Sequence, residues 1–261
     1  MPFHEMDTLR TYSFDLLDET GLIHAVFTRQ GGYSPAPWHS LNLGGTVGDD
    51  PTRVKANREL AFRATGRDPA TLFDAWLVHS AEVIYADAPR DPAKLPSQAD
   101  AILTDRPEVT LFMRFADCVP ILLHDPFRQV AGIVHAGWLG TVRGVVGKAV
   151  DMMIARYGSA VRDVHAAIGP SIAAHHYQVG EEVVQQVEEA FRMDASELLA
   201  TNGGGVQFDL WAANRLILEQ KGVQQIEISG LCTACHLEDW YSHRGENGKT
   251  GRFGVLVALN T

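Results

Sequence analysis

Hydrophobic positions along the chain fall into two patterns, continuous or alternating apolar runs and helical spacings. Apolar runs bounded by turn residues are typical of strands. They predict strands at 12–17, 22–28, 72–84, 99–104, 109–115, 121–124, 130–134, 164–172, 224–233 and 252–259. The runs around 109–134 are nearly all apolar, which is expected of strands buried on both faces.

Four segments instead show the spacing of amphipathic helices. They cover residues 52–65, 139–157, 180–193 and 209–222. The segment 139–157 carries apolar residues three, four and seven positions apart along one face, and Gly158 ends it. Asp50 and Asp209 stand where N-capping residues are preferred. Strands interspersed with helices, without a linker or repeat, predict a mixed α/β (α+β) layered fold and a single domain over residues 1–261.

The bulk composition limits the classes of partner. The chain has 261 residues, a formal charge of −10 and a pI near 5.5. This charge argues against non-specific binding to nucleic acid or anionic membranes, although a local site for a small anion remains compatible with it. No apolar run reaches the length of a membrane span, and the N-terminus lacks a signal-peptide core, so we expect a cytoplasmic protein with no membrane partner. Composition leaves the oligomeric state open.

Candidate chemistry is concentrated at Cys118 and His135. Cys118 follows one buried run, His135 ends another 17 residues later, and a turn separates them, so the two side chains can be neighbours. His79 would complete a Cys-His-His set, which zinc uses at catalytic sites that keep an open fourth position. The predicted helix start at 137–141, directly after His135, would offer backbone N–H groups to a phosphate.

The other cysteines and a histidine pair carry less weight. Cys232 and Cys235 form a CTAC pair, which could be half a zinc site or a redox motif, but we expect two thiols at a strand end without a metal. His175 and His176 are adjacent, and on a strand they would point to opposite sides and not share one metal. Three cysteines in all imply no disulfide framework.

Several segments together resemble one known family. They are SLNLGGTVGDDPTRVKANRE, LVHSAEV, ADAILTD, ADCVPILLHDP, VAGIVHAGWLGTVRGVV, IGPSIAAHHYQVGEEV and the closing CT, YSHR and GR motifs. They are similar to the YfiH family, also known as the laccase-domain or polyphenol oxidase family, which includes purine nucleoside phosphorylases and relatives associated with peptidoglycan editing. The resemblance implies a layered sandwich with mixed β-sheets, related to the catalytic domain of cytotoxic necrotizing factor.

The resemblance also implies an activity and a metal site. It implies a zinc ion held by His79, Cys118 and His135, which would be both metal ligands and catalytic residues. The implied reaction is phosphorolysis of adenosine, inosine, guanosine and methylthioadenosine, with some adenosine deamination. The partners would be a small-molecule nucleoside and phosphate.

The chain departs from the family pattern at one position that matters for phosphate. Leu139 stands where relatives commonly carry the arginine of HAGWRG, and Arg143 could occupy the same helix face one turn later. We name Arg29, Asn42 and Arg244, together with Arg143, as candidate substrate-binding residues.

Either Asp100 or Asp117 could orient a ligand or move a proton. For Asp117 a purely structural role, capping the turn, is an equal alternative.

Three alternative functions remain open. A copper polyphenol oxidase would need closely paired histidines on strands, and the chain has no His-x-His pair. A metal-free cysteine hydrolase or amidase acting on peptidoglycan precursors would use Cys118 as nucleophile and His135 as base. A non-catalytic protein that only binds zinc would need four protein ligands at a closed site.

Overall fold

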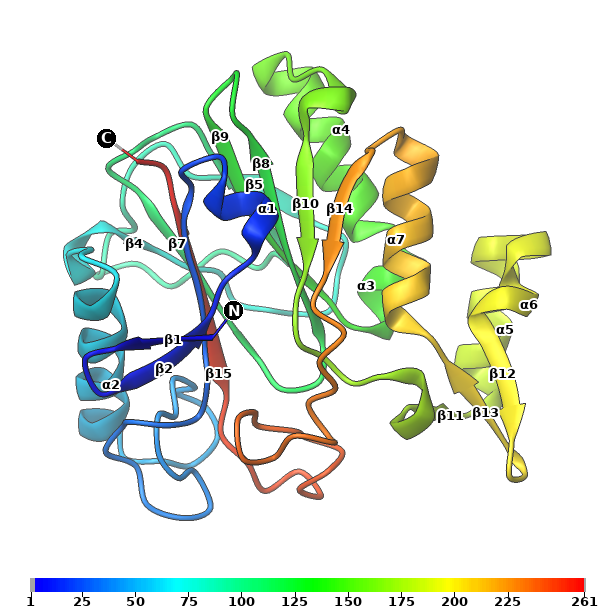
Figure 1. Ribbon diagram of the computed structural model, residues 1–261, viewed down its shortest axis with the longest axis horizontal. Coiled ribbons are helices and arrows are strands. Elements are labelled where there is room, and N and C mark those ends of the chain that lie inside the picture. Colours follow the sequence, from blue (N-terminus) through cyan, green and yellow to red (C-terminus); the bar gives the residue numbers. More distant parts are fainter. Residues whose placement is uncertain (1–2, 261) are drawn as a thin grey trace.

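Two six-stranded sheets pack face to face in the computed structural model of the protein, which describes residues 3–260 (Figure 1). The first sheet has the order β1-β2-β3-β15-β7-β4. Its strands are β1 (Phe3–Met6), β2 (Leu9–Tyr12), β3 (Ile23–Phe27), β4 (Leu72–Phe73), β7 (Thr110–Phe115) and β15 (Phe253–Ala258).

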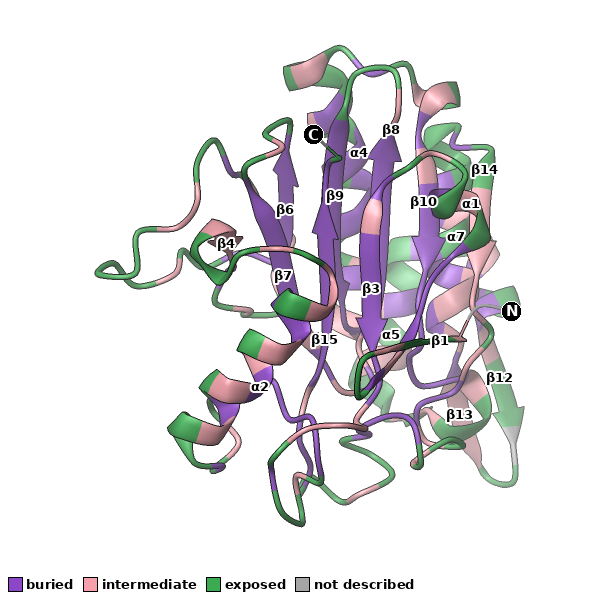
Figure 2. Ribbon diagram, turned by 60° about the vertical axis from the view of Figure 1, so that its left-hand side comes forward, coloured by how far each residue is buried: buried purple, intermediate pink, exposed green. Residues whose placement is uncertain are grey.

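The second sheet, of order β14-β10-β8-β9-β6-β5, carries two of the three candidate ligands at one end. Its strands are β5 (Val83–Tyr85), β6 (Ala101–Thr104), β8 (Val119–Asp125), β9 (Val130–Ala136), β10 (His165–Ile168) and β14 (Gln225–Ile228). All residues of β8 and β9 are buried, as Figure 2 shows. The two strands form an antiparallel hairpin in which Pro120 faces His135, so Cys118 and His135 end up at the same end of the sheet.

Helices cover the outer faces of both sheets. Alternating side chains of β7 show the layers, because Leu111 and Met113 pack between the sheets whereas Phe112 packs toward α2. Residues of α4 and α7 pack on the outer face of the second sheet. The helices are α1 (Asp15–Asp18), α2 (Pro51–Ala64), α3 (Trp138–Val142), α4 (Val145–Tyr157), α5 (Glu181–Phe191), α6 (Ala195–Leu198) and α7 (Leu210–Lys221).

Smaller elements complete the chain. A three-stranded sheet lies beside α5 and α6, at one side of the molecule (Figure 1). It is built from β11 (Gln178–Val179), β12 (Leu199–Asn202) and β13 (Gly205–Phe208). Residues 3–260 also contain the 3-10 turns Pro69–Thr71, Val161–Asp163, Ala174–His176 and Arg192–Asp194.

The mixed, layered α/β architecture is the one predicted from the sequence. The helices expected at 52–65, 180–193 and 209–222 are confirmed within a few residues. Both predicted caps form, because the side chain of Asp50 accepts the N–H of Thr52 and that of Asp209 accepts the N–H of Ala212.

The single helix predicted over 139–157 is wrong. The segment forms α3 and α4, separated at Gly144, whose φ of 70° is left-handed. Helical spacing continues across the break, but a left-handed residue cannot continue a right-handed helix. Gly158 ends α4 as predicted, also with a left-handed backbone.

Four strand predictions are also wrong in part. The segments 164–172 and 224–233 are strands only over β10 and β14, which end at Ile168 and Ile228. The segment 12–17 leaves the sheet after Tyr12 and turns into α1, where the carbonyl of Phe14 accepts the N–H groups of Leu17 and Asp18. Within 72–84 only the two ends are strands, β4 and β5. The middle, which holds His79, is a loop because its backbone N–H groups bond to a carboxylate, described below, instead of a neighbouring strand.

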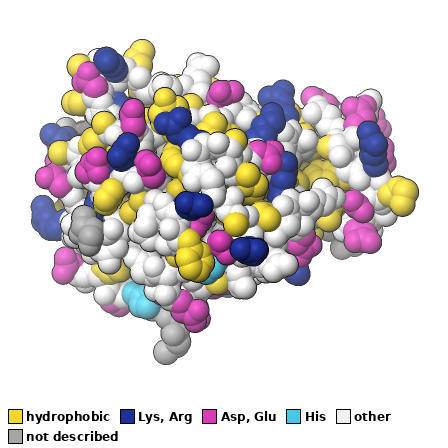
Figure 3. Space-filling view, turned by 90° about the horizontal axis from the view of Figure 1, so that it is seen from above, with side chains coloured by type: hydrophobic (Ala, Val, Ile, Leu, Met, Phe, Trp, Pro, Cys, Tyr) yellow, Lys and Arg dark blue, Asp and Glu magenta, His cyan; other side chains and the backbone are white. Residues whose placement is uncertain are grey.

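The surface has the mixed character that the composition suggests. Figure 3 shows acidic and basic side chains interspersed with hydrophobic ones over the face seen from above. Within residues 3–260, no helix has the length and apolar character needed to cross a membrane.

Candidate metal and active site

Three candidate ligands from distant parts of the sequence meet at one end of the second sheet. Cys118 immediately precedes β8, His135 lies in β9, and His79 lies in the loop between β4 and β5. Their ligand atoms all lie within 4.8 Å of one another, and Cys118 Sγ is 3.9 Å from His79 Nε2. His135 is buried, Cys118 is half-buried and His79 is exposed, so the group is accessible from the His79 side.

Asp100 holds two of these ligands in place. Its carboxylate lies 2.9 Å from His135 Nδ1, and it accepts the backbone N–H groups of Val78, His79 and Ser80 and the hydroxyl of Ser80. With Nδ1–H donating to Asp100, the ring presents Nε2 to the thiol. A carboxylate behind a histidine ligand is the usual way in which proteins orient such a ligand and raise its basicity.

The electrostatics favour a charged pair of Cys118 and His135. Burial by itself raises the pKa of Cys118, but the charge of His135 and hydrogen bonds from both histidines outweigh it and lower this pKa to about 6. Burial lowers the pKa of His135, whereas Cys118 and Asp100 raise it to about 9. Burial opposes ionisation of Asp100 as well, and the hydrogen bonds from His135 and Ser80 lower its pKa to about 2. The two shifts have opposite directions and both favour the thiolate–imidazolium form of this pair.

Gly137 leaves the space in which the ligands approach one another. A Cβ atom at this position would lie 2.9 Å from Cys118 Sγ and 3.1 Å from the His79 ring. The backbone of Gly137 is extended, so it is the space that requires glycine here. Its position in the HAGW motif thus has a steric reason.

Asp117, next to Cys118, has a structural task. Its backbone is left-handed, with φ of 82°. One carboxylate oxygen accepts the hydroxyls of Thr233 and Ser242 at 2.7 Å each, and the other accepts the N–H of Arg244 at 2.6 Å. These contacts tie the C-terminal loops to the residue before Cys118, in agreement with the alternative of a cap on the turn.

One wall of the site, beside Cys118, is formed by Asp117, Tyr177 and Arg244, of which Arg244 is a candidate substrate residue. Its backbone bonds to Asp117, its guanidinium donates to the carbonyl of Gln178 at 3.0 Å, and the group lies 5.2 Å from the centre of the Tyr177 ring. Cys118 and Asp117 help to raise the pKa of Tyr177, after burial, which places this ring in the same neighbourhood.

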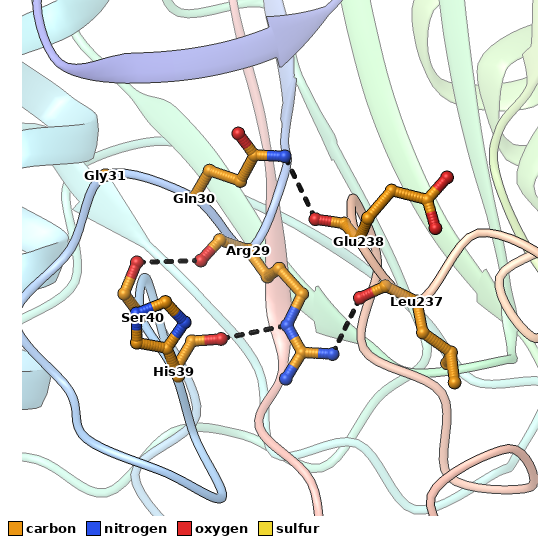
Figure 4. Close-up of a pocket in the computed structure, with 7 residues that line it drawn as sticks. All are labelled: Arg29, Gln30, Gly31, His39, Ser40, Leu237 and Glu238. Atoms are coloured by element: carbon orange, nitrogen blue, oxygen red, sulfur yellow. Dashed lines mark hydrogen bonds between the residues drawn. The ribbon is translucent and has the colours of Figure 1, made fainter.

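The structure places Arg29 at a different cavity. That cavity, of about 520 Å³, is lined by Arg29, Gln30, Gly31, His39, Ser40, Leu237 and Glu238 (Figure 4). The guanidinium donates to the carbonyls of His39 and Leu237 and pairs with Glu246 at 3.1 Å. Arg29 therefore braces loops in the structure, and His79, Cys118 and His135 are not among the described residues that line its cavity.

Asn42 and Arg143 also differ from simple pocket residues. Asn42 is buried, and its amide donates to Gly44 and Asp49 and accepts from the backbone of Gly44 and Arg252. It holds the loops that carry Arg252 and does not present a free amide. Arg143 is exposed and caps the C-terminal end of α3, the opposite end from His135.

Two partly buried arginines, Arg58 and Arg252, were not among the substrate-binding residues predicted from the sequence. Burial is the first cause that lowers the pKa of both, to about 10 for Arg58. After burial, the charge of Arg114 also lowers the pKa of Arg58. The charges of Cys118 and Asp117 instead raise the pKa of Arg252. The loop at 43–45 lies between the two arginines, since Arg58 donates to the carbonyl of Leu43 and Arg252 packs against Gly44. The closing GR motif was the only sequence signal for Arg252.

A second group of possible ligands contradicts an expectation. His175 and His176 lie in a 3-10 turn and not on a strand, so both rings reach Cys232 and Cys235. Adjacent histidines on a strand rarely serve one metal, but the geometry of a 3-10 turn allows it. Cys232 and Cys235 therefore have two histidines as neighbours, whereas their expected lack of a metal stays a prediction.

Comparisons with known proteins find relatives over most of the chain. Residues 23–260 match the family model described as multi-copper polyphenol oxidoreductase laccase. A purine nucleoside phosphorylase of Deinococcus radiodurans is 37% identical over 236 residues, covering 90% of this chain and 88% of the relative. Purine nucleoside phosphorylase YlmD of Bacillus subtilis is 36% identical over 244 residues, covering 89% and 86%.

Solved structures agree over the whole fold. YlmD of Geobacillus stearothermophilus superposes with a TM-score of 0.92 at 31% identity, covering 100% of this chain and 99% of that one. The Bacillus licheniformis protein YfiH gives 0.91 at 32% identity, with 99% of both chains covered. The chain therefore belongs to the YfiH family, the laccase-domain family of the matching model.

Proposed function

We propose that this protein is a zinc-dependent purine nucleoside phosphorylase acting on adenosine, inosine, guanosine and methylthioadenosine. The observation that carries the proposal is the convergence of His79, Cys118 and His135, with Asp100 behind His135. Relatives named purine nucleoside phosphorylase, matched over about nine-tenths of the chain, support the reaction class.

The donor set fits zinc better than a multi-copper centre. One thiolate and two imidazoles with an accessible side are typical of catalytic zinc. A His2Cys set also occurs in blue-copper sites, but a multi-copper oxidase needs further copper ions with their own histidines. Within residues 3–260, only two groups of three or more possible ligands exist, and neither contains more than two histidines. Copper is therefore the alternative metal, and zinc is the one we propose.

When bound, zinc would supply a Lewis acid at an open position. The chain itself supplies the positioning. Asp100 fixes the ring of His135 through Nδ1 and the loop of His79 through its backbone N–H. Asp100 and Gly137 therefore set the spacing of the ligands through contacts within the chain.

The arginines supply the charge that phosphate requires. Asp74 pairs with Arg90 and Arg114 at 2.7 Å, so one carboxylate faces two guanidinium groups, and Arg58 adds a third nearby. Such a local excess of positive charge can attract an anion to a protein whose net charge is negative. In phosphorolysis, a phosphate oxygen bonds to the sugar C1′ while the C1′–N9 bond breaks, and the purine leaves with the bonding electrons and takes up a proton.

The four substrate residues named from the sequence now have distinct proposed roles. Arg244 contacts substrate from the wall beside Cys118, and Asn42 acts indirectly by holding the backbone of Arg252. Arg29 shapes the neighbouring loops. A phosphate role for Arg143, and for the helix start at 137–141, remains a prediction.

A metal-free cysteine hydrolase is the second candidate because Cys118, His135 and Asp100 also form a nucleophile–base–carboxylate series. Chelators would leave such an enzyme active, whereas thiol reagents would inactivate it.

Some broader statements also remain predictions. They are the single domain over 1–261, a cytoplasmic location, adenosine deamination, and the relation to cytotoxic necrotizing factor.

The first prediction concerns turnover. Purified protein incubated with adenosine and phosphate should release adenine and ribose 1-phosphate, separable by chromatography. Cys118→Ala should lower the rate at least about 100-fold, because a ligand of the reacting centre is lost. Removal of metal by a chelator should have the same effect, and added zinc should restore activity only in the wild type.

Three results would argue against this function. Activity that survives chelation but is abolished by iodoacetamide would favour the cysteine hydrolase, and an intense blue absorption of the purified protein would favour copper. Inosine appearing without phosphate dependence would identify deamination as the main reaction.

The second prediction concerns phosphate. Arg252→Gln should raise the KM for phosphate about tenfold or more, because a hydrogen bond to a charged group contributes about 1.5–3 kcal/mol. Arg215→Gln is the matched control, since Arg215 pairs with Glu219 on the exposed side of α7. Steady-state kinetics with phosphate and nucleoside varied separately would check this, and an unchanged KM for phosphate would contradict it.

The third prediction concerns pH in the metal-free protein. The depressed pKa of Cys118 means that its thiolate is half formed near pH 6, so alkylation by iodoacetamide should already approach its plateau at pH 7. Asp100→Asn should move the midpoint upward, because a neutral neighbour no longer supports the charge on His135. Peptide mass mapping resolves each cysteine, and Cys235, whose pKa is raised first by burial and then by Cys232, is the internal reference. Equal pH profiles for both thiols would contradict the prediction.

A further inference from the structure

The second group of ligands lies outside the reacting centre and has a chemistry of its own. It joins the 3-10 turn Ala174–His176 to the turn that follows β14 and carries the CTAC motif. We propose that His175, His176, Cys232 and Cys235 bind a structural zinc ion, separate from the one at Cys118. All four ligand atoms lie within 4.8 Å of one another.

Three of the six separations between ligand atoms are close to the edges of a zinc tetrahedron. His175 Nε2 lies 3.1 Å from Cys235 Sγ, and His176 Nδ1 lies 3.5 Å from Cys235 Sγ and 3.6 Å from Cys232 Sγ. Zinc bonds of about 2.3 Å to sulfur and about 2.0 Å to nitrogen place the two kinds of ligand about 3.5 Å apart. Four ligands of the Cys2His2 type complete the shell, as at structural and not catalytic zinc sites.

The 3-10 turn explains how adjacent histidines serve one ion. The turn rotates successive side chains by about a third of a circle, so neighbours do not point to opposite faces as they do on a strand. The ring centroids of His175 and His176 are 4.5 Å apart. His175 uses Nε2 and His176 uses Nδ1, so the longer reach of one ring compensates for the offset between the two residues.

The backbone on the cysteine side also favours a metal. Cys232 Sγ accepts the N–H of Ala173 at 3.3 Å, a contact that stabilises a thiolate. The carbonyl of Cys232 accepts the N–H groups of Cys235 and His236 at 3.2 Å, and this tight turn brings both thiols to one side. Both cysteines are free thiols in the structure.

The position of this site suggests what it stabilises. Thr233, next to Cys232, donates to Asp117, which precedes the candidate ligand Cys118. Arg244 donates to the carbonyl of His176 at 3.4 Å. A zinc ion here would therefore hold together two segments that form the wall beside Cys118, and its loss should loosen Arg244 without removing a reacting group.

Metal stoichiometry tests this site independently of activity. Protein stripped of metal and titrated with zinc chloride, under reducing conditions, should bind two ions per chain by native mass spectrometry. Cys118→Ala should bind one, and the double variant His175→Ala/Cys235→Ser should also bind one. His236→Ala is the matched control and should bind two, because His236 is an exposed histidine of the same turn that pairs with Glu238.

Cobalt provides a second readout, on the Cys118→Ala variant, which keeps the second group of ligands intact. Cobalt(II) added to Cys118→Ala should give the absorption of a tetrahedral site with thiolate ligands, which is absent when Cys235 is also replaced. Zinc should raise the melting temperature of Cys118→Ala but leave that of Cys118→Ala/His175→Ala/Cys235→Ser unchanged.

The proposal is overturned if Cys118→Ala binds no zinc, or if the double variant still binds two ions. A Cys232–Cys235 disulfide that persists under the same reducing conditions overturns it as well. A protein that binds two zinc ions but has no phosphorylase activity would keep this site and reject the proposed function.

Discussion

The carboxylate of Asp100 joins the segments on which the candidate metal site is built. It lies just before β6, bonds to the ring of His135 on β9, and collects three consecutive N–H groups of the loop at 78–80. This loop has no strand partner, and His79 itself has a left-handed backbone with φ of 56°. Leaving a buried charge such as Asp100 without its partners would cost about 3–5 kcal/mol of stability. The hydrogen bonds to Asp100 therefore hold the loop at 78–80 against β9.

The two-sheet core supplies the rigid frame around that interaction. Cys118 and His135 are set by the β8–β9 hairpin, whose residues are buried on both faces. At the same end of the sheet, Asp117 ties the loops of Thr233, Ser242 and Arg244 to the residue beside Cys118. The candidate metal site at Cys118 therefore rests on strands, and the loops beside it are the ones that the second group of ligands would hold in place.

The layered fold could be predicted from the sequence because apolar runs mark most of its strands. The Cys118–His135 pair could be predicted because a single hairpin, with its turn, brings the two residues together. The placement of His79 agreed with the family resemblance, but its strand did not form, because a carboxylate 21 residues away competes for the same N–H groups. The break at Gly144 could not be predicted from the spacing of apolar residues, because that spacing continues unchanged across a single left-handed residue.

The second ligand group was missed for a related reason. Whether His175 and His176 can act together depends on whether they lie on a strand or in a 3-10 turn, and that depends on tertiary contacts. Arg29 and Asn42 were predicted to bind substrate, and only the structure shows that their hydrogen bonds are used within the chain.

X-ray diffraction on either side of the zinc absorption edge, from crystals of protein purified without chelator, tests the central claim most directly. The account predicts an anomalous peak at bonding distance, about 2.0–2.3 Å, from Cys118 Sγ and from one nitrogen each of His79 and His135. Absence of that peak, with Cys118 Sγ in direct hydrogen-bond contact with His135, would contradict a metal site and leave the cysteine nucleophile as the better account.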